Sequence, residues 1–195
     1  MTAISPLQTI HKKGIFGDHH KQNESDLLNI SELKNFTVIQ ITQYKNSKIQ
    51  LENIEIDGLK ISSQNSKVFS NKDSRILWSA PNTWLVISKK ENIIKSINQK
   101  CDNENFAVTN ISHSRAIIQI KGPKAKEVLK KGCPINFNDF EKNNCAGSVF
   151  HGINIMIDCV ENHPQTLNLL TLRSFGESLY HHITDASLEF GYVGV

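Results

Sequence analysis

Arginine is scarce in this chain, and no dense basic segment takes its place. Only 3 of the 22 basic residues are arginines, and the formal net charge is +3. Because nucleic-acid binding requires a concentrated basic patch, we expect no nucleic-acid partner. The three arginines stand out among 19 lysines as the basic residues to follow in the structure.

Long hydrophobic runs are also missing. No stretch of 18 uncharged apolar residues occurs, so no membrane-spanning helix is predicted. Lys12 and Lys13 are reached without an apolar segment that could serve as a secretory signal, and we therefore expect a cytoplasmic protein. The 195 residues, 38% of them hydrophobic, correspond to one large globular domain or two small ones.

The common sequence signatures of catalysis are absent. The 10 glycines form neither the GxGxxG dinucleotide fingerprint nor the GxxxxGK[ST] phosphate loop. The GxSxG and HExxH motifs do not occur either. These absences exclude the enzyme classes built on such motifs, although they do not exclude catalysis itself.

The four cysteines are spaced too widely for a structural zinc site. Zinc ribbons and fingers need closely paired ligands, and the sequence has no CxxC. We expect reduced, partly buried thiols and no bound metal. Cys133 follows a predicted helix end, where the helix dipole disfavours a thiolate, so a structural role is expected for it. The others are Cys101, Cys145 and Cys159.

Apolar residues with a period of two predict nine strands. Asn46-Ser47 is expected to join the first two as a hairpin, and Pro81-Asn82 to turn between the next two. The predicted strands span residues 36–41, 49–56, 75–80, 83–88, 106–111, 115–120, 145–150, 153–160 and 166–172.

Three helices are predicted as well. Residues 89–100 carry isoleucines at helical spacing, and a second helix follows Gly122-Pro123. The third starts at Ser174, with Glu177 completing a capping box, and Phe175 begins its apolar stripe.

The order of these elements predicts an α+β fold. Strand pairs followed by helices indicate mostly antiparallel sheets with split βαβ (ferredoxin-like) units. Residues 36–195 are expected to form a single α+β body. Residues 1–35 contain few apolar side chains and are expected to form an irregular arm that lies along another surface.

The densest polar cluster is the connection between two predicted strands at residues 110–115. His113 could act as a base or contact an anion, and Arg115 could hold a carboxylate or phosphate. Alternatively, serine and asparagine side chains such as Ser112 satisfy turn amides, and Arg115 pairs with an acidic neighbour.

Two tryptophans, Trp78 and Trp84, flank the turn at Pro81. Isolated tryptophans usually contribute buried area. We therefore expect core or interface anchors here rather than residues that stack on a ligand.

Several short segments carry a resemblance to a known family. They are Ser5-Pro6-Leu7, Trp78–Val86 (WSAPNTWLV), Val108–Arg115 (VTNISHSR), Gly122-Pro123, Leu129, Lys131–Ile135 (KGCPI), Arg173–Phe175 (RSF) and Glu189–Gly191 (EFG). In this order and at these separations, they resemble the gamma subunit of heterotetrameric sarcosine oxidase. Asn110 and Ser114 stand where that family usually has Asp and Gly, which argues against an acid–base role for this turn.

The resemblance implies the folate-binding fold of aminomethyltransferases and a place in a complex with alpha, beta and delta subunits. In such complexes, alpha carries NAD and the tetrahydrofolate site, beta carries FAD, covalent FMN and sarcosine oxidation, and delta carries zinc. The complex demethylates sarcosine to glycine, reduces oxygen to hydrogen peroxide and passes the one-carbon unit to tetrahydrofolate.

For this chain, the resemblance implies a structural subunit without a cofactor, metal or catalytic residue of its own. The arm at residues 1–35 would then pack on partner subunits. The residues expected at a subunit interface or near a partner's cofactor are Ser112, His113, Arg115, Trp78 and Trp84.

A free-standing folate-binding or aminomethyltransferase-like protein is the alternative that the same fold permits. Such enzymes are typically much longer than this chain and need a carboxylate for the pterin. Residues 110–115 contain no acidic residue.

Overall fold

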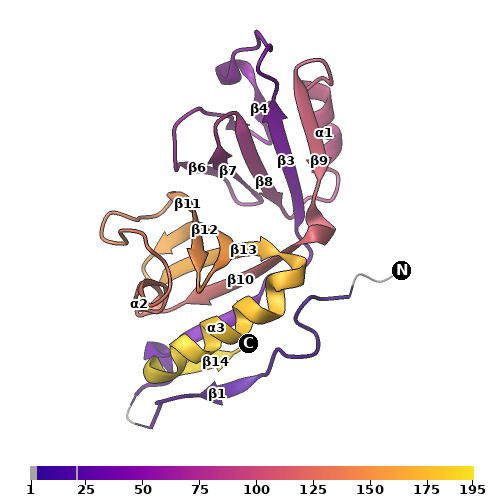
Figure 1. Ribbon diagram of the computed structural model, residues 1–195. Helices are drawn as coiled ribbons and strands as arrows, with labels where there is room; N and C mark the ends of the chain where they lie inside the picture. The colour runs from indigo at the N-terminus through magenta and orange to yellow at the C-terminus, as the bar shows by residue number, and fades with distance from the viewer. Residues whose placement is uncertain (1–3, 21) are drawn as a thin grey trace. The chain divides into compact units, whose positions relative to one another are not determined.

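The structure is a computed structural model that describes residues 4–20 and 22–195. The chain divides into two compact units, each built on its own sheet (Figure 1). Unit 1 takes in the described residues up to Lys34 together with residues 113–142 and 146–195, and unit 2 takes in residues 35–112 and 143–145. This division differs from the single body expected over residues 36–195.

Unit 1 contains a seven-stranded sheet in the order β1-β14-β2-β10-β13-β12-β11. β14 runs parallel to β2, whereas β10 is antiparallel to both β2 and β13. β13 and β14 therefore run in the same direction with two strands between them, and helix α3 connects them as a split βαβ unit. The strands are β1 (Gly14–Phe16), β2 (Leu28–Glu32), β10 (Arg115–Lys121), β11 (Cys145–Phe150), β12 (Ile153–Asn162), β13 (Gln165–Leu172) and β14 (Tyr192–Gly194).

Helices α2 (Ala125–Lys130) and α3 (Gly176–Ser187) contact each other and the sheet of unit 1. Leu179 and Ile183 of α3 are fully buried, which confirms the central part of the predicted apolar stripe. The core of unit 1 also takes alternate residues of the strands, such as Ile118, Ile120, Leu167 and Leu169.

The predicted start of the third helix is wrong. Arg173–Phe175 form a 3-10 turn, η4, and α3 begins at Gly176 without a side-chain cap. Glu177 instead accepts a hydrogen bond from the Thr9 hydroxyl at 3.0 Å. Phe175, expected in the stripe, is 47% exposed because the 3-10 turn directs it away from the core face.

The N-terminal segment, expected to be irregular, contributes strands to unit 1. β2 lies inside the sheet between β14 and β10, and its Leu28 and Ile30 are fully buried. Leu7 is also fully buried in the core of unit 1. The expectation of an irregular arm is wrong for these residues, since a strand with only two alternating apolar side chains gives too short a periodic signal.

Unit 2 contains a five-stranded antiparallel sheet in the order β6-β7-β8-β3-β9. Helix α1 (Ile93–Lys100) links β8 to β9, and both strands are antiparallel to β3 between them. This is a second split βαβ unit, as the sequence predicted. The strands are β3 (Thr37–Gln43), β6 (Val68–Ser70), β7 (Ser74–Ala80), β8 (Thr83–Ser88) and β9 (Phe106–Asn110).

The hairpin predicted around Asn46-Ser47 does not form. Residues 49–56 contain the 3-10 turn η2 (Leu51–Asn53) and the short strand β4 (Glu55–Ile56), which pairs with β5 (Leu59–Lys60). The turn of this hairpin is Asp57-Gly58, with φ of 53° and 76°. Asp-Gly favours a two-residue hairpin turn more strongly than Asn-Ser does, because both positions need a positive φ.

Candidate functional site

The connection at residues 110–115 is held by hydrogen bonds within unit 2. Ser112 Oγ accepts a bond from the Val38 N–H at 2.9 Å and donates one to Asn110 Oδ1 at 2.6 Å. Asn110 Oδ1 also accepts the Ser112 N–H at 3.0 Å. Asn110 thus satisfies a turn amide, as the alternative interpretation expected, whereas Ser112 Oγ accepts an amide of strand β3. Asn110 supplies the same oxygen acceptor that an Asp would supply.

Arg115 does not form the predicted pair with an acidic neighbour among the described residues. Its Nη1 donates to the Ser114 carbonyl at 3.4 Å. Its side chain is half-buried, and burial lowers the pKa of the guanidinium. Ser114 has no positive φ, so a glycine is not required at this position.

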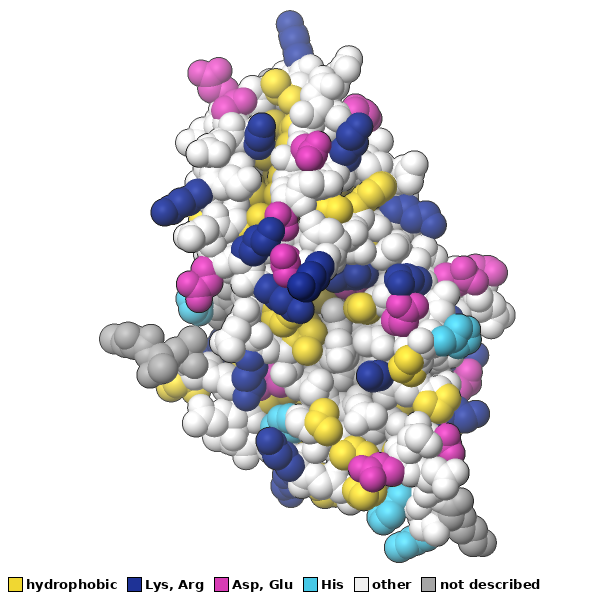
Figure 2. All heavy atoms as spheres, turned by 180° about the vertical axis from the view of Figure 1, so that it is seen from behind, with side chains coloured by type: hydrophobic (Ala, Val, Ile, Leu, Met, Phe, Trp, Pro, Cys, Tyr) yellow, Lys and Arg dark blue, Asp and Glu magenta, His cyan; other side chains and the backbone are white. Residues whose placement is uncertain are grey.

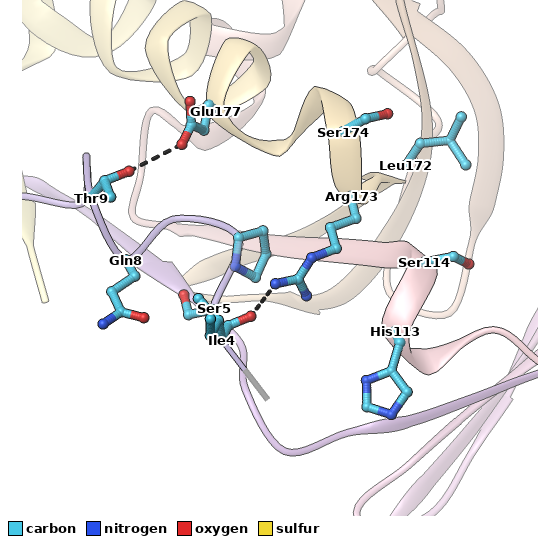
Figure 3. Close-up of a pocket in the computed structure, with 11 residues that line it drawn as sticks. Ile4, Ser5, Gln8, Thr9, His113, Ser114, Leu172, Arg173, Ser174 and Glu177 are labelled. Carbon is cyan, nitrogen blue, oxygen red and sulfur yellow. Dashed lines mark hydrogen bonds between the residues drawn. The ribbon is translucent and has the colours of Figure 1, made fainter. Parts of the chain in front are cut away.

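His113 lies in a different environment, at an open pocket of about 900 Å³ on unit 1 (Figure 3). The pocket also contains Glu177, which was predicted only as part of a capping box, and Arg173, which was predicted to lie just before the third helix. Its lining comes from three segments far apart in the chain: Ile4, Ser5, Pro6, Gln8 and Thr9, then His113 and Ser114, then Leu172, Arg173, Ser174 and Glu177.

Hydrogen bonds fix the N-terminal segment at this pocket. Arg173 Nη2 donates to the Ile4 carbonyl, and Ser5 Oγ donates to Glu32. Gly176 allows the close approach, since a Cβ on it would lie 3.0 Å from Ala116 Cβ and 3.4 Å from Pro6 Cβ. The pocket is therefore a built feature of unit 1. Its sequence signal was Arg173 itself, one of only three arginines.

The two tryptophans belong to the core of unit 2. Trp84 is 1% exposed, and its Nε1 donates to the Ser62 carbonyl at 2.8 Å. Trp78 is half-buried and packs against the same core. Their interpretation as core anchors is confirmed, and Trp84 has almost no surface left for a partner.

The four cysteines are buried and form no disulfide bond. Burial raises the pKa of both Cys101 and Cys133 to about 11, so neither thiol ionises readily near neutral pH. Within residues 4–20 and 22–195, no group of three or more His, Cys, Asp or Glu side chains is placed to hold a metal ion. No helix in this part of the chain is long and apolar enough to cross a membrane.

Charged side chains of both signs are interspersed on the surface. Figure 2 shows lysines and arginines alternating with acidic side chains and with exposed apolar ones. This distribution agrees with the small net charge.

Two of the segments behind the family resemblance contact each other at the end of α3. Lys131 Nζ donates to the Ala186 carbonyl at 2.5 Å and lies 3.0 Å from Glu189 Oε1. The same ammonium lies 4.7 Å from the centroid of the Phe190 ring. A cation at a helix C-terminus interacts favourably with the helix dipole, so these contacts stabilise the end of α3.

Comparison with known proteins places the sequence in a family. A model of the sarcosine oxidase gamma subunit family matches residues 54–189. The sarcosine oxidase gamma subunit of Corynebacterium sp. strain U-96 is 25% identical over 118 residues, which cover 59% of this chain and 57% of the relative. That of strain P-1 is 25% identical over 124 residues, covering 62% and 60%. The chain thus spans about 60% of the curated relatives that it matches.

Solved structures share the fold. A chain of heterotetrameric sarcosine oxidase from Corynebacterium sp. U-96 superposes with a TM-score of 0.80 at 19% identity, over 96% of this chain and 95% of that chain. The glycine cleavage system aminomethyltransferase T from Bartonella henselae superposes with a TM-score of 0.58 at 10% identity, over 82% and 46%. The predicted α+β, aminomethyltransferase-like fold is confirmed. Because the family model covers more than half of its length, this chain belongs to the sarcosine oxidase gamma subunit family.

Proposed function

We propose that this chain is the structural gamma subunit of a heterotetrameric sarcosine oxidase and that it assembles with alpha, beta and delta subunits. The observation that carries this proposal is the fold shared with a chain of such a complex over 96% of this chain and 95% of that one. Membership of the gamma subunit family supports it. Exposed apolar side chains on unit 1, including Ile4, Phe175 and Leu188, are the kind of surface that partner subunits cover.

The chemistry belongs to the partners in this proposal. Sarcosine is oxidatively demethylated to glycine with formation of hydrogen peroxide, and the one-carbon unit passes to tetrahydrofolate. The partner subunits hold FAD, FMN, NAD, tetrahydrofolate and zinc. The complex works in the cytoplasm, where the four cysteine thiols would remain reduced.

His113 and Arg115 are proposed as residues at or near an interface. His113 is exposed, and Arg115 is half-buried. The variant Arg115→Ala distinguishes a role of Arg115 in assembly from a role near a partner's cofactor. If Arg115 only supports assembly, the variant lowers the yield of complex without lowering turnover per assembled complex. If it lies near a partner's cofactor, turnover falls while assembly is retained.

A subunit-omission experiment tests the proposed function. Alpha, beta and delta subunits from the same source are coexpressed with and without this chain, and the assembled mass and sarcosine-dependent peroxide formation are measured. The proposal predicts loss of the complete complex without this chain. An unchanged complex and unchanged activity would contradict it.

A free-standing tetrahydrofolate-binding protein is the second candidate, favoured by the fold shared with the aminomethyltransferase from Bartonella henselae. Calorimetric titration of the isolated chain with tetrahydrofolate distinguishes the two. Micromolar binding would support this candidate, whereas the structural role predicts no heat of binding.

A further inference from the structure

Arg173 offers hydrogen-bonding capacity that this chain leaves open. A guanidinium has five N–H donors in a planar fork that suits a carboxylate. The hydrogen bond that Arg173 makes goes to a neutral acceptor, the Ile4 carbonyl. Among the described residues, no carboxylate lies within ion-pairing distance of it.

The charges around the pocket are arranged unevenly. Glu177 lies toward Thr9 and accepts its hydroxyl, whereas Arg173 extends toward the N-terminal segment, with His113 beyond it (Figure 3). A ligand carboxylate is therefore attracted to the end that holds Arg173 and His113 and repelled from the end that holds Glu177.

Exposed apolar side chains accompany this cation. Ile4 is 68% exposed and Leu172 is 44% exposed, and both line the pocket together with Pro6. Phe175, at the end of η4, is 47% exposed. Arginine and aromatic residues are enriched at protein interfaces, and apolar side chains around a charged pair exclude water from it.

Three separate segments that carry the family resemblance converge at this pocket. Ser5 and Pro6 belong to the first, His113 to the second, and Arg173 to the third. The buried side chains of these segments, such as Leu7, stabilise the fold of unit 1. An exposed side chain such as His113 adds little to that stability, so it is available for a partner.

We propose that this pocket is the docking site for a segment of a partner subunit that carries an Asp or Glu next to an apolar side chain. The carboxylate binds Arg173 on the side of His113, and the apolar side chain packs on Ile4 and Leu172. This inference rests on the proposed function, because it names the contact through which the chain joins its complex.

Charge variants of the full chain test the site in the coexpressed complex. Arg173→Glu is expected to weaken association with the partner subunits about tenfold or more, since it places two carboxylates together. Arg173→Lys keeps the charge and is expected to lose less than Arg173→Glu. Lys124→Glu, an exposed charge reversal elsewhere on unit 1, is the matched control and is expected to leave association unchanged.

Arg173→Glu also removes the hydrogen bond to the Ile4 carbonyl and could disturb the fold. A cross-linking experiment tests the docking site without this substitution. Ser174 is exposed and lines the pocket, so a photo-reactive amino acid can replace it in the otherwise unchanged complex. Irradiation followed by mass spectrometry is expected to identify one partner peptide with an acidic residue beside an apolar one.

The outcomes separate this inference from the proposed function. If the wild-type chain copurifies with its partners but Arg173→Glu binds as tightly, or Lys124→Glu is equally impaired, the docking site is overturned and the proposed function stands. The docking site is also overturned if position 174 yields no partner cross-link. If the wild-type chain does not copurify at all, the proposed function fails as well.

Discussion

Leu7 is the residue through which the N-terminal segment is predicted to stabilise unit 1. Its side chain is fully buried, and Leu7 Cδ2 lies 3.7 Å from the Cβ position of Gly176. Leu7→Ala removes three carbons from a site in the core of unit 1 at the start of α3, where the packed neighbours limit how far the cavity can collapse. We therefore expect a loss of about 3–5 kcal/mol in the free energy of unfolding of unit 1.

Hydrogen exchange in increasing urea measures this loss unit by unit. Peptides from β2 and β10 report on unit 1, and the fluorescence of Trp78 and Trp84 reports on unit 2. With a urea dependence of about 1.5 kcal/mol per molar, a loss of about 3 kcal/mol lowers the midpoint of unit 1 by about 2 M. Ile4→Ala, at a 68% exposed position, is the control and is expected to cost less than about 0.5 kcal/mol. A Leu7→Ala midpoint equal to that of Ile4→Ala would refute the reasoning.

Three further predictions concern single residues of unit 1. Gly191→Ala is expected to cost about 1–3 kcal/mol in thermal or urea unfolding, because φ is 68° and the new Cβ would lie 2.7 Å from the Asp18 carbonyl oxygen; a neutral effect would contradict this geometry. Lys131→Met should cost about 1–2 kcal/mol by removing the cation at the end of α3, and a stability unchanged from wild type at low salt would argue against that contact. Desolvation lowers the pKa of His11 below 6.5, so the unfolded chain takes up the proton first and stability falls as the pH drops through about 6.5. His11→Phe should flatten the stability–pH curve in this range. An unchanged slope would mean that another group causes the pH dependence.

Long periodic segments were predictable from the sequence, and short ones were not. β10 and β13 have 7 and 8 residues and carry apolar side chains at alternate positions, such as Ile118 and Ile120 or Leu167 and Leu169, and both were predicted close to their observed bounds. β2 has 5 residues and β14 has 3, so their apolar alternation is too brief to stand out. Their places in the sheet depend on pairing with distant strands, which local periodicity does not encode.

The candidate site was predictable only in part for the same physical reason. The connection at residues 110–115 was visible as a local cluster of polar residues. Arg173 stood out as one of three arginines, but the sequence did not indicate its contact with Ile4, because the two residues are 169 positions apart in the chain. A pocket assembled from three distant segments emerges from tertiary packing alone.

Native mass spectrometry of the tagged chain, coexpressed with alpha, beta and delta subunits from the same source, tests the proposed subunit role most directly. The account predicts one assembly that contains this chain together with all three partners and that oxidises sarcosine. Recovery of this chain alone, beside an active complex assembled without it, would contradict the account.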